Sequence, residues 1–342
     1  MKKFVAIVLT LVMALALVSC GSKGQTQAPA QDASNQTTDT PGSSQAAPSL
    51  DWPKKTIQIT VGYAAGGDTD LYARTCAKYL EEKLGVTVVV INTTGASGVT
   101  GAISVMDSAA DGYNVLFNHY GCLVNEATGT AGISFVDDMA QACTVLVDNS
   151  YTLCASKDCG LEDWDDLVAY ATAHPDELTI AANANSNGYD IVQQIEDAAG
   201  IQIKQVEGSG SASERIAAIL GGQHDLIYAN YSLLSDYIEN GDLIVMGSIG
   251  TERCAAHTDV PCLTELIGKD IISPYIFSFR FPADTDEAIL DYFDSVMEEI
   301  CADEAFKAEI EHMGGNVYFT DRQTSYDAQV ESLAEIKVRL GV

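Results

Sequence analysis

The chain has 342 residues, of which 48 are acidic and 18 are basic, so its formal net charge is -30 at pH 7. A surface this acidic repels nucleic acid and anionic lipid, and we therefore expect neither as a partner. After the N-terminal segment, no run is apolar and long enough to cross a bilayer, and the remaining length favours two lobes over a single core.

The first residues predict export. Lys2 and Lys3 precede an apolar run over residues 4–18, and small residues follow up to Cys20. A charged start, a short apolar run and small residues before a cut are typical of a secretory signal peptide, here residues 1–20. The cysteine at the cut matches a lipobox, so we expect Cys20 to be acylated. The alternative is an ordinary signal peptide that happens to hold a cysteine.

A flexible tether is expected over residues 21–50, because this Ser-, Thr-, Gln-, Ala- and Pro-rich segment has too little apolar bulk to fold. Folded structure is expected from near Trp52 to the end. The protein would then be lipid-anchored to the outer face of the cell membrane, or periplasmic in a cell with two membranes.

Cysteine and histidine give little sign of a metal. No two cysteines form a tight CxxC pair, and the five histidines are scattered, so we expect neither zinc nor a cofactor. Disulfides and free thiols both stay open for the eight cysteines other than Cys20. These are Cys76, Cys122, Cys143, Cys154, Cys159, Cys254, Cys262 and Cys301.

Strands and helices alternate along the rest of the chain. In a first series, strands are predicted over residues 57–61, 86–91 and 114–117, with helices over 71–84 and 101–109. In a second, strands are predicted over 179–182, 201–206, 225–229 and 243–248, with helices over 161–173, 189–199 and 213–220. Helices at 287–301, 304–313 and 326–340 follow. This order predicts an α/β fold with parallel or mixed sheets.

Several strand-to-helix joints are rich in Gly, Ser, Thr and Asn. They lie at residues 64–69, 182–188 and 208–213, with a related loop at 92–101. Helix N-termini offer unpaired N–H groups and a partial positive charge, and in open α/β sheets such joints lie where ligands bind. Each joint alone is equally explained by N-capping. Their coincidence predicts a site for a carboxylate that needs neither Arg nor Lys.

Enzyme signatures are weak. Residues 206–213 only half-match a dinucleotide fingerprint, and neither G-x-S-x-G nor HExxH is present. His119 follows a predicted strand but has no identifiable nucleophile beside it. We therefore expect His119 to be a polar cleft or surface residue and the protein not to be an enzyme.

From Trp52 onward the chain resembles the substrate-binding proteins of tripartite tricarboxylate transporters, the TctC or Bug family. The order and spacing of short motifs carry the resemblance. They are Trp52-Pro53-Lys54-Lys55-Thr56-Ile57, Gly66-Gly67-Asp68-Thr69-Asp70 with Arg74, Asn92 with Gly95-Ala96-Ser97-Gly98 and Gly101-Ala102, Asp111-Gly112-Tyr113, Gly210-Ser211, Gly221-Gly222 with Asp225, and Arg253 with Asp259-Val260-Pro261.

The resemblance implies a two-lobed, periplasmic-binding-protein-like fold of type II, a Venus flytrap with two interlobe crossovers. We expect residues 51–153 and 273–342 to form lobe 1 and residues 154–272 to form lobe 2. It also implies a monomeric extracytoplasmic receptor that captures a small carboxylate and delivers it to the membrane permease subunits of a tripartite transporter.

The resemblance also implies that two loops grip the ligand, near residues 63–70 and 183–189. In our hypothesis glycines and Thr69 supply amides, Ser186 and Ser211 supply hydroxyls, and Asp225 orients a water or a polar group of the ligand. The predicted ligand-binding residues are Tyr63, Gly66, Gly67, Asp68, Thr69, Ser186, Asn187, Gly210, Ser211 and Asp225.

The second loop departs from the family pattern, because Asn183, Asn185 and Tyr189 stand where glycines and a histidine are usual. The alternatives are therefore a receptor of the same fold for an amino acid or a neutral solute, serving another transporter, a secreted enzyme that uses the cleft, and a structural lipoprotein.

Overall fold

The computed structural model describes residues 50–342 apart from 185, 209–210, 255–256 and 273–274. The predicted signal peptide with Cys20 and nearly all of the predicted tether lie outside the described residues, as do Asn185 and Gly210. Residues Ser49–Val342 form one compact unit.

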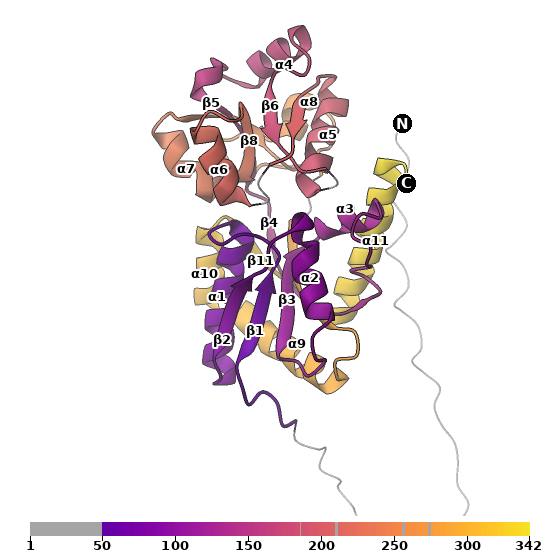
Figure 1. Ribbon diagram of the computed structural model, residues 1–342. Helices are drawn as coiled ribbons and strands as arrows, with labels where there is room; N and C mark the ends of the chain where they lie inside the picture. The colour runs from indigo at the N-terminus through magenta and orange to yellow at the C-terminus, as the bar shows by residue number, and fades with distance from the viewer. Residues whose placement is uncertain (1–49, 185, 209–210, 255–256, 273–274) are drawn as a thin grey trace, which may run out of the picture. The chain divides into compact units, whose positions relative to one another are not determined.

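Two β-sheets organise this unit (Figure 1). The first has the order β11-β4-β10-β3-β1-β2, with β1, β2 and β3 parallel and β10 antiparallel to both of its neighbours. Its strands are β1 (Ile57–Val61), β2 (Val88–Asn92), β3 (Asn114–His119), β4 (Met139–Asp148), β10 (Ile276–Pro282) and β11 (Gly315–Thr320).

The second sheet has the order β7-β6-β8-β5-β9, with β6, β7 and β8 parallel and β5 antiparallel to β8 and β9. Its strands are β5 (Tyr151–Ser156), β6 (Thr179–Ala181), β7 (Lys204–Val206), β8 (Leu226–Asn230) and β9 (Leu243–Ser248).

Helices connect and cover the strands. They are α1 (Asp68–Leu84), α2 (Val99–Met106), α3 (Cys122–Ala127), α4 (Trp164–Ala173), α5 (Asn187–Ala199), α6 (Ala212–Leu220), α7 (Tyr231–Glu239), α8 (Leu263–Ile267), α9 (Glu287–Ala302), α10 (Glu304–His312) and α11 (Arg322–Leu340), with short 3₁₀ turns η1 (Ala96–Gly98) and η2 (Lys157–Cys159).

The chain passes between the sheets twice, from β4 to β5 and from β9 to β10. We call the first sheet with α1–α3 and α9–α11 the first lobe, and the second sheet with α4–α8 the second lobe. The two-lobed α/β architecture with two crossovers is as predicted. The exact lobe boundaries at 153/154 and 272/273 stay a prediction.

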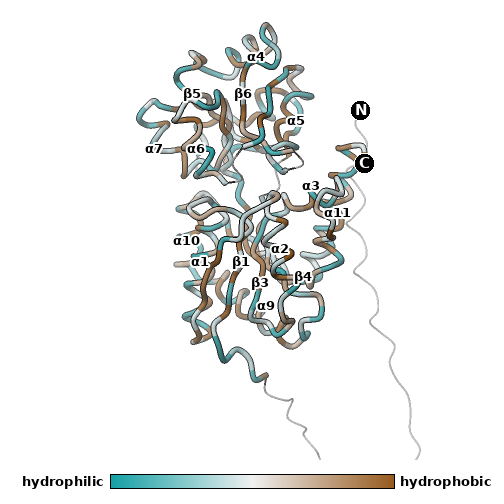
Figure 2. The backbone as a smooth tube through the Cα atoms, in the orientation of Figure 1, coloured by the Kyte–Doolittle hydropathy of each residue, from teal (hydrophilic) through white to brown (hydrophobic). Residues whose placement is uncertain are grey.

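Apolar side chains hold the helices against the sheets, and Figure 2 shows β1 and β3 among the hydrophobic stretches of the tube. On one face of the first sheet, α1, α9 and α10 contribute buried residues such as Tyr72, Phe293 and Phe306. On the other, α2, α3 and α11 join a separate cluster that includes Val105 and Ile336. Burial of such side chains is the main stabilising term of the fold.

The edge strand β2 differs from expectation. The apolar run at 86–91 predicts a strand buried on both faces, yet Val89 and Ile91 are 37% and 40% exposed. The reason is position, because β2 pairs only with β1 and lies at the end of the sheet. The parallel pairing itself is as predicted.

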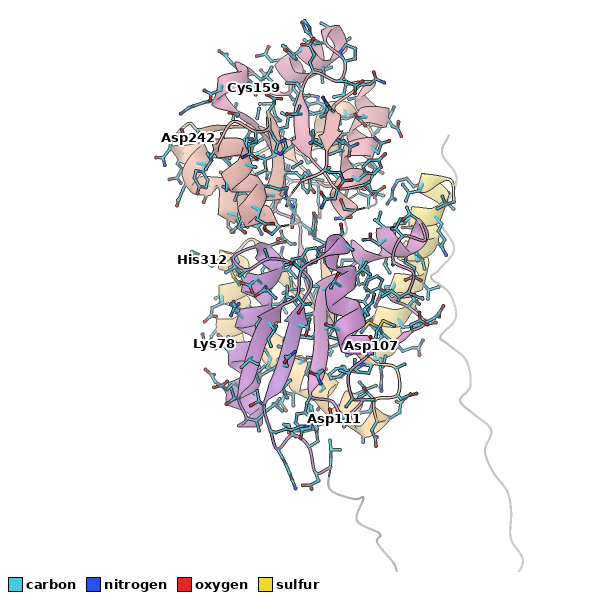
Figure 3. All side chains as sticks on the ribbon, viewed as in Figure 1. Lys78, Asp107, Asp111, Cys159, Asp242 and His312 are labelled. Atoms are coloured by element: carbon cyan, nitrogen blue, oxygen red, sulfur yellow. The ribbon has the colours of Figure 1, made fainter. Side chains whose placement is uncertain are left out.

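Most charged side chains lie on the outside, as Figure 3 illustrates for Lys78 and Asp107. Ion pairs such as Lys78–Glu309 and Lys157–Asp242 are largely solvent-exposed and add little stability. Seven of the cysteines named above are free thiols, namely Cys76, Cys122, Cys143, Cys154, Cys159, Cys262 and Cys301.

A buried polar network lies at the β4–β5 crossover. The Asp148 carboxylate accepts hydrogen bonds from Ser150 N at 2.9 Å, from Tyr72 Oη at 2.8 Å and from the Asn230 side chain. Asn230 lies at the end of β8 in the second lobe and also donates to the Met313 carbonyl at 2.8 Å in the first. The network therefore ties the two lobes together beside one crossover.

This network makes stability depend on pH. Burial, with the nearby Asp68 charge also contributing, raises the pKa of Asp148 from 3.8 to about 6. A raised carboxyl pKa means that the folded state binds more protons than the unfolded state between these values. The stabilisation that Asp148 contributes to the folded state is thus fully present below about pH 4 and is lost as the pH rises through 6. At about 1.4 kcal/mol per pKa unit, it is on the order of 3 kcal/mol.

We expect the free energy of unfolding of the wild type to fall, relative to that of Asp148→Asn, between pH 4 and pH 7. Urea denaturation of both proteins at several pH values measures this difference. Other titrating groups are shared by the two proteins and cancel. Parallel pH profiles would show that Asp148 has no raised pKa.

Candidate ligand-binding cleft

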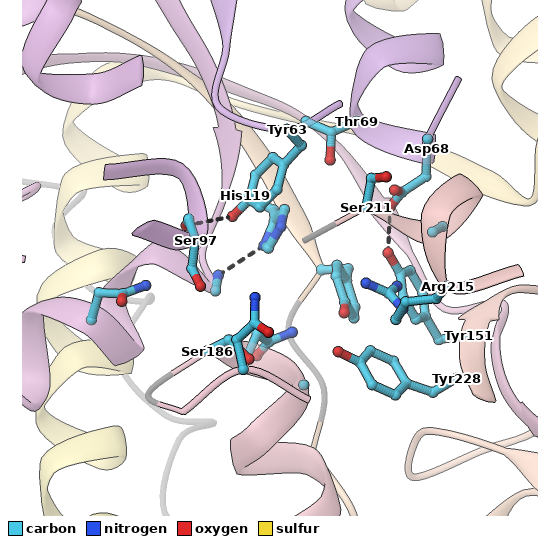
Figure 4. A pocket seen from close by; sticks show the side chains of 18 residues that line it. Tyr63, Asp68, Thr69, Ser97, His119, Tyr151, Ser186, Ser211, Arg215 and Tyr228 are labelled. Atoms are coloured by element: carbon cyan, nitrogen blue, oxygen red, sulfur yellow. Dashed lines mark hydrogen bonds between the residues drawn. The ribbon is translucent and has the colours of Figure 1, made fainter. Parts of the chain in front are cut away.

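A partly open cavity lies where the first turns of α1, α5 and α6 meet (Figure 4). Its volume is about 50 Å³, on a scale where one water takes roughly 10–15 Å³. The cavity therefore has room for a few non-hydrogen atoms in this arrangement of the lobes. Both lobes contribute to its lining.

The β1–α1 joint forms one wall through Tyr63, Gly67, Asp68 and Thr69. Asp70 fixes the shape of this joint. Its carboxylate accepts hydrogen bonds from the Gly66 N–H at 2.9 Å and from the side chains of Arg74 and Asn92. Gly66 has a φ of +80°, a value that favours glycine. The turn therefore aims the start of α1 at the cavity.

The joint before α5 forms the opposing wall. Ser186 is the N-cap, and its Oγ accepts the Tyr189 N–H at 3.2 Å. That leaves the N–H groups of Asn187 and Gly188 at the free helix end. Gly188 is required by packing, because a Cβ there would lie 1.6 Å from Tyr228 Oη.

The joint before α6 is fixed by a capping box. Ser211 Oγ accepts the Glu214 N–H at 3.3 Å, and the Glu214 side chain bonds back to the Ser211 backbone. The Ser213 hydroxyl donates to the Ala65 carbonyl of the first lobe at 3.3 Å. This helix end is thereby held against the β1–α1 joint.

Arg215 brings a positive charge into the cavity. It is 7% exposed, and its guanidinium carbon lies 4.5 Å from the centre of the Tyr228 ring, a cation–π arrangement. Among the residues that the structure describes, no hydrogen bond or ion pair reaches its guanidinium, and Nε is buried. Burial acts to lower the pKa of Arg215, but the neighbouring tyrosines and Asp68 keep it raised.

Asp68 is the acid of the cavity wall and accepts a hydrogen bond from Tyr151 Oη (Figure 4). Burial raises the pKa of this carboxyl, against the opposing effects of Tyr151 and Arg215. Asp68 and Arg215 influence each other without an ion-pair contact.

His119 lies between aromatic rings, 5.0 Å from Tyr63 and 4.9 Å from Tyr275 between ring centres. Its Nδ1 accepts the Gly121 N–H at 3.0 Å. Burial, with help from Arg215 and Arg280, lowers the pKa of His119 to about 3. The ring is therefore neutral near pH 7, with its proton on Nε2, and acts as a donor rather than a charge.

The structure brings seven of the ten predicted residues together in the cavity lining. They are Tyr63, Gly67, Asp68, Thr69, Ser186, Asn187 and Ser211. Gly66 does not line it, because its N–H is held by Asp70. Gly210 lies outside the described residues.

Asp225 lies elsewhere. Its carboxylate accepts the Thr179 N–H at 2.8 Å and the Thr179 hydroxyl at 2.7 Å. Asp225 directly precedes β8, at the amino end of a strand whose carboxyl end faces the helix joints. Ligands of α/β sheets bind beyond the carboxyl ends, whereas Asp225 lies at the other end of its strand and does not line the cavity.

Arg215 was not among the predicted residues, yet it lines the cavity that was expected to need neither Arg nor Lys. Its position offered a signal, because Arg215 lies four residues after the N-cap Ser211, one helical turn along the same face of α6. Tyr151, Tyr228 and Tyr275 were not predicted either, because the side chains of a strand or crossover that reach the cavity depend on long-range pairing, even for Tyr228 in the predicted strand 225–229.

The chemistry of the lining suits an organic anion, because buried donors, one guanidinium and three helix N-termini dominate the cavity.

Over residues 50–342 with the gaps given above, no group of three or more His, Cys, Asp or Glu side chains is placed to hold a metal ion. Within the same range no helix combines the length and apolar character needed to cross a membrane.

Two α/β lobes joined by two crossovers, with a cavity between them, are typical of solute-binding receptors. A family model, "Tripartite tricarboxylate transporter family receptor" (TctC), matches residues 72–337. The chain belongs to this family of solute-binding receptors.

Related sequences and solved structures of the same fold agree with this family assignment. Protein BugT of Bordetella pertussis is 28% identical over 75% of this chain and 81% of its own, and a UPF0065 protein of Cupriavidus necator is 29% identical over 70% and 72%. The periplasmic binding protein BugD superposes with a TM-score of 0.76 at 22% identity, covering 85% of this chain and 99% of its own.

Two further structures of the same fold hold ligands. Rpa4515 of R. palustris was solved with adipate, with a TM-score of 0.76 at 21% identity over 85% of this chain and 99% of that one. MatC of Rhodopseudomonas palustris was solved with malate, with a TM-score of 0.75 at 19% identity over 84% and 99%.

Proposed function

We propose that this protein captures a small carboxylate in its interlobe cavity and delivers it to the membrane permease subunits of a tripartite tricarboxylate-type transporter. The observation that carries the proposal is the convergence of Arg215 and the first turns of α1, α5 and α6 on one cavity. The family and the carboxylates bound by the two R. palustris proteins support it.

The mechanism we propose is closure of two lobes, with residues 51–153 and 273–342 in one and 154–272 in the other. A ligand that contacts both walls binds the closed form better and shifts the open–closed equilibrium toward it. The permease would then recognise the closed form. The receptor is a monomer, exported and held at the membrane by acylated Cys20, and it does not transform its ligand.

Thermal-shift measurements on the full chain test this function against a panel of mono-, di- and tricarboxylates, with sugars and neutral amides as controls. At a ligand concentration of about 100 times Kd, the stabilisation is about 2.7 kcal/mol, which shifts Tm by several degrees. We expect at least one carboxylate to raise Tm and no control to do so.

Mass spectrometry of the incubated ligand completes the test. We expect the bound acid to be recovered unchanged, whereas a reaction product would identify an enzyme. A Tm that responds to a sugar or an amide but to no carboxylate would replace the proposal with a neutral-solute receptor. No response to any solute would leave a structural lipoprotein.

A further inference from the structure

Few charged side chains line the cavity, and they differ in whether they already have a hydrogen-bond partner. Arg215 is the only Lys or Arg and Asp68 the only acid among the described lining residues. Asp68 already accepts a hydrogen bond from Tyr151, whereas the Arg215 guanidinium has no such partner among the described residues and its Nε is buried. A buried charge without a partner costs free energy because it is poorly solvated. An anionic ligand therefore gains most by pairing with the guanidinium.

The helix N-termini add less positive charge than their number suggests. Each of the three helices carries an acid in its first turn: Asp68 and Asp70 in α1, Asp190 in α5 and Glu214 in α6. These carboxylates already interact with the partial positive charge at the helix ends. Arg215 therefore remains the main positive charge that awaits a ligand.

Asp68 disfavours a second ligand carboxylate. Two carboxylates close together in a poorly solvated site repel each other, and one of them must take up a proton. An ammonium or hydroxyl group in the same place would instead donate to the Asp68 carboxylate. The neutral donors of the lining, among them Asn125 Nδ2 and the His119 ring, orient ligand oxygens without adding charge.

From these contacts we infer that the solute is a small monocarboxylate whose carboxylate pairs with Arg215 and whose ammonium or hydroxyl group faces Asp68, in preference to a di- or tricarboxylate. This inference rests on the proposed function and names the ligand class of the same cavity. The volume of about 50 Å³ agrees with an acid of few carbon atoms.

Titration calorimetry of the full chain with matched acids tests the ranking. The set is alanine, lactate, propionate and malonate, with succinate and malate as longer dicarboxylates. We expect alanine or lactate to bind at least about tenfold more tightly than propionate, malonate and succinate, because only they combine one carboxylate for Arg215 with a donor for Asp68. Whichever of the two binds better identifies the donor as ammonium or hydroxyl.

Two substitutions assign the roles. Arg215→Met keeps most of the side-chain volume and removes the charge, and we expect it to weaken binding of the preferred acid at least about 100-fold, with Arg215→Lys in between. Asp68→Asn keeps the shape, and we expect it to improve malonate and succinate binding relative to the preferred acid by about tenfold.

The outcomes separate this inference from the proposed function. If a dicarboxylate binds the wild type most tightly, or if Arg215→Met binds every acid as the wild type does, the inference is wrong while the carboxylate receptor stands. If no carboxylate binds the wild type at all, both are wrong. Because the ranking is measured on the wild type, it holds even if a variant fails to fold.

Discussion

Gly188→Ala is expected to weaken ligand binding by at least about 100-fold while the protein still folds. A Cβ at this position would lie 1.6 Å from Tyr228 Oη and 2.2 Å from Cζ, so the ring or the start of α5 has to move. Tyr228 supports the Arg215 guanidinium, and α5 supplies the opposing wall of the cavity. Overpacking of this kind costs about 1–3 kcal/mol of stability.

The matched control is Gly221→Ala, at the C-terminal end of α6 and outside the cavity lining. Its Cβ would meet nothing closer than the Ala217 carbonyl oxygen at 3.2 Å, and its φ of -81° suits alanine. Calorimetry on both variants, with urea denaturation to follow stability, compares them. Equal affinity in Gly188→Ala and the wild type would show that the ligand does not use this wall.

Asn118→Leu is expected to lower the free energy of unfolding by about 3 kcal/mol. Arg280 in β10 is fully buried, and its guanidinium bonds to the side chains of Asn118 and Gln329 and to Ser278 Oγ at 3.2 Å. No carboxylate pairs with it among the residues that the structure describes. Removing a neutral partner leaves a buried charge poorly satisfied, which is strongly destabilising.

Arg280→Met removes the charge, which is the costly element, but leaves the side-chain oxygens of Asn118 and Gln329 without this donor. We therefore expect it to lower the free energy of unfolding by about 1 kcal/mol, less than Asn118→Leu does. The double variant Asn118→Leu with Arg280→Met should then recover most of the loss. Urea denaturation of the three variants decides this. If Arg280→Met is as destabilised as Asn118→Leu, the guanidinium contributes net stability and the interpretation is wrong.

Local patterns in the sequence predicted the joints that build the cavity. A β-branched strand followed by Gly, Ser or Asn and then by an amphipathic run marks the starts of α1, α5 and α6, because N-caps and strand periodicity are local properties. The expected starts, at residues 71, 189 and 213, fall within three residues of the observed ones, Asp68, Asn187 and Ala212.

Elements that depend on distant partners could not be predicted in this way. Strand β10 carries the buried Ser278 and Arg280, which break the apolar pattern, and it is defined by antiparallel pairing with β3 and β4. The same limit explains Tyr275, which reaches the cavity from beside this strand. Asp225 lies outside the cavity lining for a simpler reason, because it precedes its strand and does not follow it.

The structure of the complex with the tightest-binding acid tests the central claim most directly. We predict ligand density in the cavity between α1, α5 and α6, with a carboxylate within hydrogen-bond distance of the Arg215 guanidinium and of N–H groups at a helix end. A ligand bound in another pocket, or a carboxylate in this cavity that makes no contact with Arg215, would contradict the account.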